Sequence, residues 1–295
     1  MAGERLLASF SLLNQLLFRW TGKCFETATS HIQTLAIIKK MRKSLIIITL
    51  LLSSLNILAR CGSYGLTAFP SNDIVSLNSN FTLQGYAQSQ GIIDSLNIKY
   101  PIYLISENQK IGLIVVEINV GMYSIKQVVL RPSSPLQPNT TYELRIDNLP
   151  DFHQSSVSKY DEVNFIRKDA KWTTNSNLDN IAPQFLKLPK FKENVYKEKG
   201  CGPDMYSVFK LKTDDKESSL VKVELREIIR RDTITHTYYL RPTDNGELRV
   251  GRRMCSGEFT YERKYKYQIR FSLFDYSGNT NGQWTDWVKH EPYEK

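Results

Sequence analysis

Few residues in this chain belong to types that carry out covalent or metal chemistry, and they lie far apart. Three of the four cysteines follow an apolar N-terminal segment: Cys61, Cys201 and Cys255. His153, His236 and His290 are widely spaced, and we expect each of them on the surface. A zinc site needs about four ligands close together, which two thiols without flanking histidines do not supply. The serine-hydrolase, zinc-protease and phosphate-loop motifs do not occur, so we expect no enzyme, no metal and no cofactor.

The cysteines are better suited to a disulfide. Cys201-Gly202-Pro203 and Met254-Cys255-Ser256-Gly257 are both turn-like sequences. An exported chain is free to form disulfides, so we predict a Cys201–Cys255 bridge. It would close a loop of about 55 residues, worth roughly 4 kcal/mol on the chain-entropy model. Cys61 would then be removed, lipidated or left as a thiol.

Aromatic and acidic residues leave two alternatives open: a carbohydrate-binding module and a glycosidase. Trp284, Trp287 or Tyr238 would serve a carbohydrate-binding module if one of them lay exposed on a flat face. In an alternating strand Trp284 and Trp287 face opposite sides, and the simpler interpretation is a Trp that covers the domain junction. A glycosidase pair of carboxylates is defined by a three-dimensional separation that the sequence does not give.

An export signal precedes the part of the chain with regular strand patterns. The basic residues Lys39 to Lys43 are followed by an apolar run from Leu45 to Leu58 and then by Ala59-Arg60-Cys61, which together predict a signal peptide over 41–61. The run is shorter than the roughly 20 residues of a membrane-spanning helix. Residues 1–40 are interpreted as an N-terminal extension, with Met41 as the alternative start. Leu58-Ala59-Arg60-Cys61 also resembles a lipoprotein box, with Arg60 as a departure, so lipidation of Cys61 is the alternative to its removal.

The basic charge is concentrated in this leader. The chain has 39 basic and 30 acidic residues, and residues 1–60 hold eight basic and two acidic ones. The remainder has 39 − 8 = 31 basic and 30 − 2 = 28 acidic residues, a balance of +3. We therefore expect no nucleic-acid partner. Contact with a membrane would occur only through the export signal or a lipid anchor.

Short alternating segments over 64–178 predict a first β-sandwich. Strands are expected at Phe81–Tyr86, Pro101–Ile105, Ile111–Val120, Tyr123–Arg131 and Tyr142–Leu149, with Lys171–Thr174 closing the domain. The sequence Leu136-x-Pro138-x-Thr140-x-Tyr142 predicts a tyrosine corner, in which a buried Tyr hydroxyl bonds to upstream backbone. Pro138 favours the turn that precedes the strand.

A second sandwich is predicted over 181–293. Leu220–Ile229 and Thr233–Leu240 have the pattern of a hairpin, and Tyr265–Phe274 alternates strongly. Asp275, Gly278 and Asn279 then form a D-x-x-G-N turn, in which Gly278 supplies a positive φ. A calcium site built from Asp275 and Asp179 at the domain junction is the alternative interpretation.

These motifs resemble a known family. Leu130-Arg131-Pro132, the corner motif, the closing Trp172-Thr173-Thr174, the D-x-x-A-P sequence at Asp179–Pro183 and the D-x-x-G-N turn are similar to bacterial Ig-like domains of surface and S-layer-type proteins. Trp172 stands where Phe is usual. Fibronectin type III domains share the corner and are the competing family.

The expected fold is all-β, with two tandem immunoglobulin-like antiparallel β-sandwiches after an N-terminal helical leader. The resemblance implies an exported protein at the outer surface of the cell or outside it, with a structural, adhesive or spacer role. A carbohydrate- or peptide-binding module, or an accessory domain of an extracellular enzyme system, is the alternative. The expected partner is a cell-surface protein or a glycan.

Overall fold

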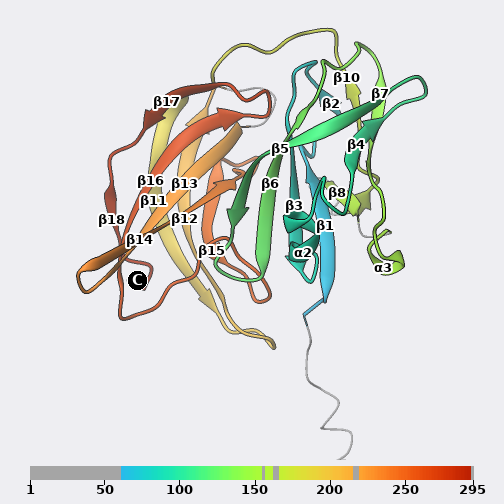
Figure 1. Ribbon diagram of the computed structural model, residues 1–295. Coiled ribbons are helices and arrows are strands. Elements are labelled where there is room, and N and C mark those ends of the chain that lie inside the picture. Colours follow the sequence, from blue (N-terminus) through green and yellow to red (C-terminus); the bar gives the residue numbers. More distant parts are fainter. Residues whose placement is uncertain (1–60, 155–156, 162–165, 215–218, 294–295) are drawn as a thin grey trace, which may run out of the picture. The chain divides into compact units, whose positions relative to one another are not determined.

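The computed structural model describes residues 61–154, 157–161, 166–214 and 219–293 (Figure 1). The expected extension over 1–40 lies outside these residues, as does the expected signal peptide apart from Cys61. The described residues belong to one compact unit that spans Arg60–Lys295. Within the described ranges, no helix has the length and apolar character needed to cross a membrane.

Among the described residues, ten strands and two short helices form the N-terminal part of this unit. The strands join in the order β2-β10-β7-β4-β5-β6-β3-β1-β8-β9. Their bounds are β1 (Tyr64–Phe69), β2 (Ile74–Val75), β3 (Phe81–Ala87), β4 (Ile102–Ile105), β5 (Lys110–Val120), β6 (Ile125–Pro132), β7 (Thr141–Ile146), β8 (Val157–Asp161), β9 (Ile166–Lys168) and β10 (Lys171–Thr174), with helices α2 (Gln90–Asp94) and α3 (Asp151–Gln154). Pairing is antiparallel except for β1 with β8 and β10 with β2, which are parallel.

The long strand β5 pairs with strands of both sheets of the sandwich, β4 in one and β6 in the other. Its first residues pair with β4, and the rest pairs with β6, with a register shift between Val115 and Glu117. A bulge of this kind bends a strand, so β5 joins the β4 half to the β6 half, as Figure 1 shows. The two halves pack face to face, because the rings of Phe81 on β3 and Trp172 on β10 lie 4.7 Å apart between centroids. The arrangement is a β-sandwich.

Period-two alternation determines which residues fill this first core. Phe81 and Leu83 on β3 are fully buried, as are Leu66 and Ala68 on β1. The sequence pattern predicted β3 but not β1, β8 or β9. These three strands are short, and their alternation mixes small, polar and charged residues, so the hydrophobic signal is weak.

Eight strands make up the C-terminal part of the unit. One sheet has the order β11-β12-β15, and the other has β14-β13-β16-β17 with β18 also paired to β16. The bounds are β11 (Phe185–Lys197), β12 (Asp204–Thr213), β13 (Ser219–Ile229), β14 (Asp232–Leu240), β15 (Glu247–Arg252), β16 (Lys266–Asp275), β17 (Thr280–Trp284) and β18 (Val288–His290). The predicted hairpin is present, since β13 pairs with β14 from Val221–Leu240 to Ile229–Asp232.

A second core lies between these two sheets. Phe209 on β12 and Phe271 on β16 meet edge to face with centroids 5.0 Å apart. Val223 and Leu225 on β13 and Leu248 on β15 are fully buried in the same cluster. The all-β fold class is therefore confirmed, and the strands pack as sandwiches. β10 ends at Thr174 and β11 begins at Phe185; the domain boundaries at 178 and 181 stay a prediction.

Candidate functional site

The corner motif forms a closed hydrogen-bonded turn. The buried Tyr142 hydroxyl accepts a hydrogen bond from the Gln137 N–H at 3.0 Å and donates to Gln109 Oε1 at 2.9 Å. Leu136 is buried beside it, and Thr140 Oγ1 donates to the Pro138 carbonyl at 3.0 Å. These contacts satisfy the Tyr142 and Thr140 hydroxyls from within the chain, so the motif positions the start of β7.

The D-x-x-G-N turn is likewise closed on itself. The two Asp275 carboxylate oxygens accept from the Asn279 N–H at 2.7 Å and from Asn279 Nδ2 at 2.9 Å, while Gly278 has φ 84°. Asn279 Nδ2 also donates to the Asp179 carbonyl at 2.9 Å, which ties the turn to the linker. The Asp179 side chain accepts from the Ile181 N–H at 3.1 Å. The carboxylates proposed for calcium are thus used in local hydrogen bonds.

The predicted Cys201–Cys255 bridge is wrong. Cys255 forms its disulfide with Cys61, with 5.6 Å between the Cα atoms and a sequence separation of 194. Cys201 lies half-buried in the turn between β11 and β12. A Cys61 sulfur in a disulfide carries no lipid thioether, so the lipidation alternative is incompatible with this bridge. The prediction failed because Cys61 was assigned to the leader, which left Cys201 as the remaining partner.

The two tryptophans near the C-terminus do not face opposite sides, because β17 ends at Trp284. The Arg270 guanidinium carbon lies 4.4 Å from the Trp284 ring centroid and 4.5 Å from the Trp287 ring centroid. Arg226 lies 3.7 Å from the Trp287 centroid, and Arg270 forms an ion pair with Glu224 at 2.6 Å. Each indole ring therefore has at least one arginine guanidinium over it, where a sugar would otherwise stack.

We expect these stacked groups to contribute to stability as a unit. Trp287→Ala should lower the free energy of unfolding by about 1–2 kcal/mol, because two partly desolvated cation–π contacts are lost. Urea unfolding of Trp287→Ala, Arg270→Ala and the double variant measures the coupling. Losses that simply add up would show that the ring and the guanidinium do not interact.

Two of the three histidines are buried, so the prediction that all three lie on the surface is wrong. His153 is 3% exposed and His290 is 4% exposed. His290 Nε2 lies 3.1 Å from Ser207 Oγ and 3.2 Å from the Tyr261 hydroxyl. A serine beside a histidine resembles an activated nucleophile, but Ser207 is 0% exposed. The rings of Phe209 and Tyr261 pack on the imidazole, so substrate has no access to this pair.

The burial of His290 makes stability depend on pH. Desolvation lowers its pKa from 6.5 to about 4. Between these values the unfolded chain binds a proton that the folded protein does not, so the free energy of unfolding falls as pH decreases from about 6.5 to about 4. The loss should reach about 3 kcal/mol at pH 4. Urea unfolding at several pH values measures it, and His290→Gln should flatten the profile in this window. Parallel profiles for the two proteins would contradict the assignment.

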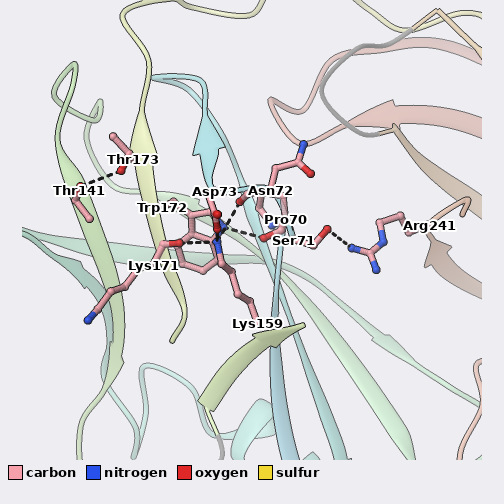
Figure 2. Close-up of polar contacts among 10 residues, drawn as sticks. All are labelled: Pro70, Ser71, Asn72, Asp73, Thr141, Lys159, Lys171, Trp172, Thr173 and Arg241. Carbon is pink, nitrogen blue, oxygen red and sulfur yellow. Dashed lines mark hydrogen bonds and ion pairs between the residues drawn. The ribbon is translucent and has the colours of Figure 1, made fainter. Parts of the chain in front are cut away.

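A buried lysine fixes the orientation of β8. The Lys159 ammonium donates to the carbonyls of Asn72 at 3.3 Å and Lys171 at 2.8 Å, and it pairs with the Asp73 carboxylate (Figure 2). Because side chains alternate along a strand, Ser158 and Tyr160 point to the opposite face of the sheet. That face forms one wall of a groove.

The groove lies between the face of the first sandwich formed by β1, β3, β6 and β8 and the β14–β15 region of the second. Its main cavity has a volume of about 430 Å³. Residues from both parts line it, among them Thr67, Gln84, Ser158, Arg249 and Arg252. A second cavity of about 440 Å³ shares Thr67, Gln84 and Arg167 with it and reaches Cys255. The two cavities are therefore parts of one elongated groove that ends at the disulfide.

Specific contacts hold the two walls together. Gln127 Nε2 donates to the Tyr239 carbonyl at 3.1 Å, and the Tyr239 N–H donates back to Gln127 Oε1 at 3.3 Å. Glu117 accepts from Lys222 Nζ at 3.0 Å and from the Tyr239 hydroxyl at 3.0 Å. Arg241 Nη1 donates to Ser71 Oγ at 2.7 Å, as Figure 2 shows. The groove is thus a preformed feature of the fold.

Arginines dominate the charge of this groove. Arg167, Arg249, Arg252 and Arg253 line it, and in the part of the chain that the structure describes none of the four forms an ion pair with a carboxylate. Tyrosine rings position two of them: Arg252 lies 4.8 Å from the Tyr123 centroid and Arg249 lies 5.6 Å from the Tyr206 centroid. Guanidinium groups in this state are suited to bidentate binding of an anion.

Gly251 allows the strand that carries these arginines to lie close to its neighbour. It has φ 147°, and a Cβ at this position would lie 2.4 Å from the Met205 carbonyl oxygen. Any larger residue would push β15 away from β12. The position of Arg249 and Arg252 in the groove therefore depends on this glycine.

Two buried hydroxyl groups in the groove have no hydrogen-bond partner. Thr82 Oγ1 and Ser158 Oγ are both inaccessible to solvent and unpartnered, and the two residues are 2% and 7% exposed. Buried polar groups are nearly always hydrogen-bonded, and exceptions mark strain or a missing partner. Both residues line the main cavity. The groove therefore combines unpaired cations with unsatisfied hydroxyls.

Sequence reasoning missed this site. Its residues come from at least seven strands. The four arginines without a carboxylate partner do not form a recognisable sequence motif. The adjacent Arg252 and Arg253 were the only local signal. None of the predicted motif residues lines the groove except Cys255 at its end.

Comparison with known proteins gives no family assignment. No family model matches the chain, and no curated protein matches it. Similar solved structures include the type I pullulanase of Bacillus subtilis str. 168 complexed with maltose, at 12% identity over 78% of this chain and 25% of that chain, with a TM-score of 0.20. The maltotriose-complexed pullulanase of Anoxybacillus sp. LM18-11 has 9% identity over 76% and 25%, with a TM-score of 0.21. The tandem Ig repeats of Dlar have 8% identity over 77% and 96%, with a TM-score of 0.20.

The chain spans about a quarter of the length of these pullulanases. Likenesses at this level assign neither a ligand nor an activity. What the structure itself defines is a class: an all-β protein with sandwich packing, an internal disulfide and an arginine-lined groove.

Proposed function

We propose that this protein is a non-catalytic, immunoglobulin-like binding protein of the cell surface or extracellular space. It binds an anionic ligand in the groove between its two sandwiches and so acts as an adhesive module. The observation that carries this proposal is the set of four arginines without carboxylate partners that line one groove. Guanidinium groups that form no ion pair within the described chain keep their N–H donors available for bidentate binding of an anion.

The disulfide supports an exported location. Cys61 and Cys255 are joined over 194 residues, and structural disulfides persist mainly in oxidising compartments outside the cytosol. The resemblance of the corner, closing and D-x-x-G-N motifs to bacterial Ig-like surface domains supports the same location.

A binding role is favoured over catalysis by the setting of the reactive groups. The Ser207–His290 pair is buried below aromatic rings. In the groove, Glu247 accepts from Lys192 at 2.9 Å, and this bond lowers the pKa of the carboxyl. Neither arrangement presents a general base or a nucleophile to a ligand.

Retention on immobilised dextran sulfate at low ionic strength tests the proposal. The Arg249→Ala/Arg253→Ala double variant should elute at clearly lower salt than the wild type, because two guanidinium contacts are lost. Lys187→Ala/Arg231→Ala is the matched control: it removes the same charge from exposed positions that do not line the groove. Equal shifts for the two double variants would show that binding follows overall charge, and the proposal would fail.

A further inference from the structure

The shape of the groove limits the kind of anion that fits it. The two cavities of about 430 and 440 Å³ share lining residues and continue into each other as far as Cys255. A compact ion such as free phosphate would fill only a small part of this length. An extended segment of a linear polymer would contact both cavities at once.

The lining combines charged and neutral contacts. Arg167 lies on the wall of the first sandwich, whereas Arg249 and Arg253 lie on the wall of the second. Thr82 and Ser158 contribute buried, unpartnered hydroxyls to the lining of the same cavity. This combination is suited to a chain that carries carboxylates at intervals and hydroxyl groups between them.

Two glutamates in the groove disfavour a phosphate polymer. Glu247 and Glu258 line the same cavity as the arginines. A polyphosphate or a DNA backbone offers only acceptor oxygens to these carboxylates and no hydroxyl donor. A sugar chain instead offers hydroxyl donors to carboxylate side chains.

An acidic peptide finds no free strand edge on β1 or β3, the central strands of the first-sandwich wall. Extended peptides bind by pairing with an unpaired strand edge. Here β3 is paired on both sides by β1 and β6, and β1 is paired on both sides by β3 and β8. The groove therefore presents side chains on a sheet face and no free edge of these strands.

We propose that the groove binds a linear acidic oligosaccharide through the carboxylates of its uronic-acid residues. This inference rests on the proposed function, for which it names the ligand class. Arg167, Arg249 and Arg253 bind the carboxylates, and Thr82 and Ser158 bind the sugar hydroxyls.

Titration calorimetry of the full chain with tetragalacturonate tests this inference, with the fully methyl-esterified tetramer as the ligand control. We expect binding of the acid and at least about tenfold weaker binding of the ester, because the ester has no carboxylate for the guanidiniums. Arg253→Ala should weaken binding of the acid about tenfold, whereas Arg231→Ala should leave it unchanged.

Ser158→Ala separates binding from folding. Removing a buried hydroxyl that has no partner should leave the melting temperature unchanged or raise it. If the hydroxyl binds sugar, the same variant should weaken tetragalacturonate binding about fivefold. Unchanged affinity in this variant would show that the Ser158 hydroxyl does not contact the sugar.

Other outcomes overturn the inference in distinguishable ways. Equal binding of acid and ester would show that charge is not recognised. A second outcome is arginine-dependent binding of polyphosphate, single-stranded DNA or polyglutamate without binding of tetragalacturonate. It would show that the ligand is another anion, and the proposed function would still hold. Absence of binding to any of these anions and to dextran sulfate would overturn both.

Discussion

Cys255→Ser is expected to lower the free energy of unfolding by about 3–5 kcal/mol. The bridge to Cys61 spans 194 residues, and on the chain-entropy model a loop of this length is worth about 5 kcal/mol, less any strain in the folded state. Cys255 also lines the end of the groove. Losing the bridge should therefore loosen that end as well, with weaker retention on dextran sulfate. Urea unfolding under non-reducing conditions measures the stability change.

Cys201→Ser is the matched control and should leave the free energy of unfolding within about 1 kcal/mol of the wild type. Non-reducing peptide mapping of the mature protein should recover a Cys61–Cys255 peptide pair. Recovery of a Cys201–Cys255 pair, together with a large effect of Cys201→Ser, would reverse the assignment. With that result, lipidation or removal of Cys61 would again be the expected outcome for this residue.

Trp172→Ala should cost about 3–5 kcal/mol, the range for removing a large aromatic side chain from a core. Trp172 is 1% exposed, packs on Phe81, and lies opposite the buried Tyr142 in the β10–β7 pairing. Its Nε1–H donates to the Pro70 carbonyl at 2.8 Å (Figure 2). The substitution removes the packing and leaves that carbonyl without this donor.

Trp172→Phe isolates the hydrogen bond from most of the packing. Phe keeps an aromatic ring in the core but has no N–H donor, so we expect it to fit, at a cost of about 1–2 kcal/mol. Urea unfolding compares the two variants. Equal losses for Phe and Ala, or a loss below about 1 kcal/mol for Ala, would show that the ring does not support the core as described.

The consequence for function is that the groove depends on elements far from its charged residues. Lys159 orients β8, and through β8 it turns Ser158 toward the groove. Arg241 and Ser71 join the two walls at one side, and the disulfide lies at one end of the groove. Variants at these positions should change ligand binding without touching the ligand.

The sequence by itself determined the class of the fold and many of its strands. Strict alternation in Phe81–Tyr86, Ile111–Val120 and Tyr265–Phe274 predicts strands because side-chain direction reverses at every residue. The corner and D-x-x-G-N motifs are also partly local: the Gln137–Tyr142 and Asp275–Asn279 hydrogen bonds join residues five and four positions apart. Local patterns of this kind need no knowledge of the rest of the chain.

Only the tertiary structure decided the disulfide, the tryptophan stack and the groove. Cys61 and Cys255 are brought together across a sequence separation of 194. Three cysteines allow three pairings, and the sequence gives no reason to choose this one. Trp284 and Trp287 share Arg270 because the strand ends between them. Arg167 and Arg249 meet in one groove because the first sandwich packs against the second. Each of these depends on non-local pairing, which periodicity along a single strand does not encode.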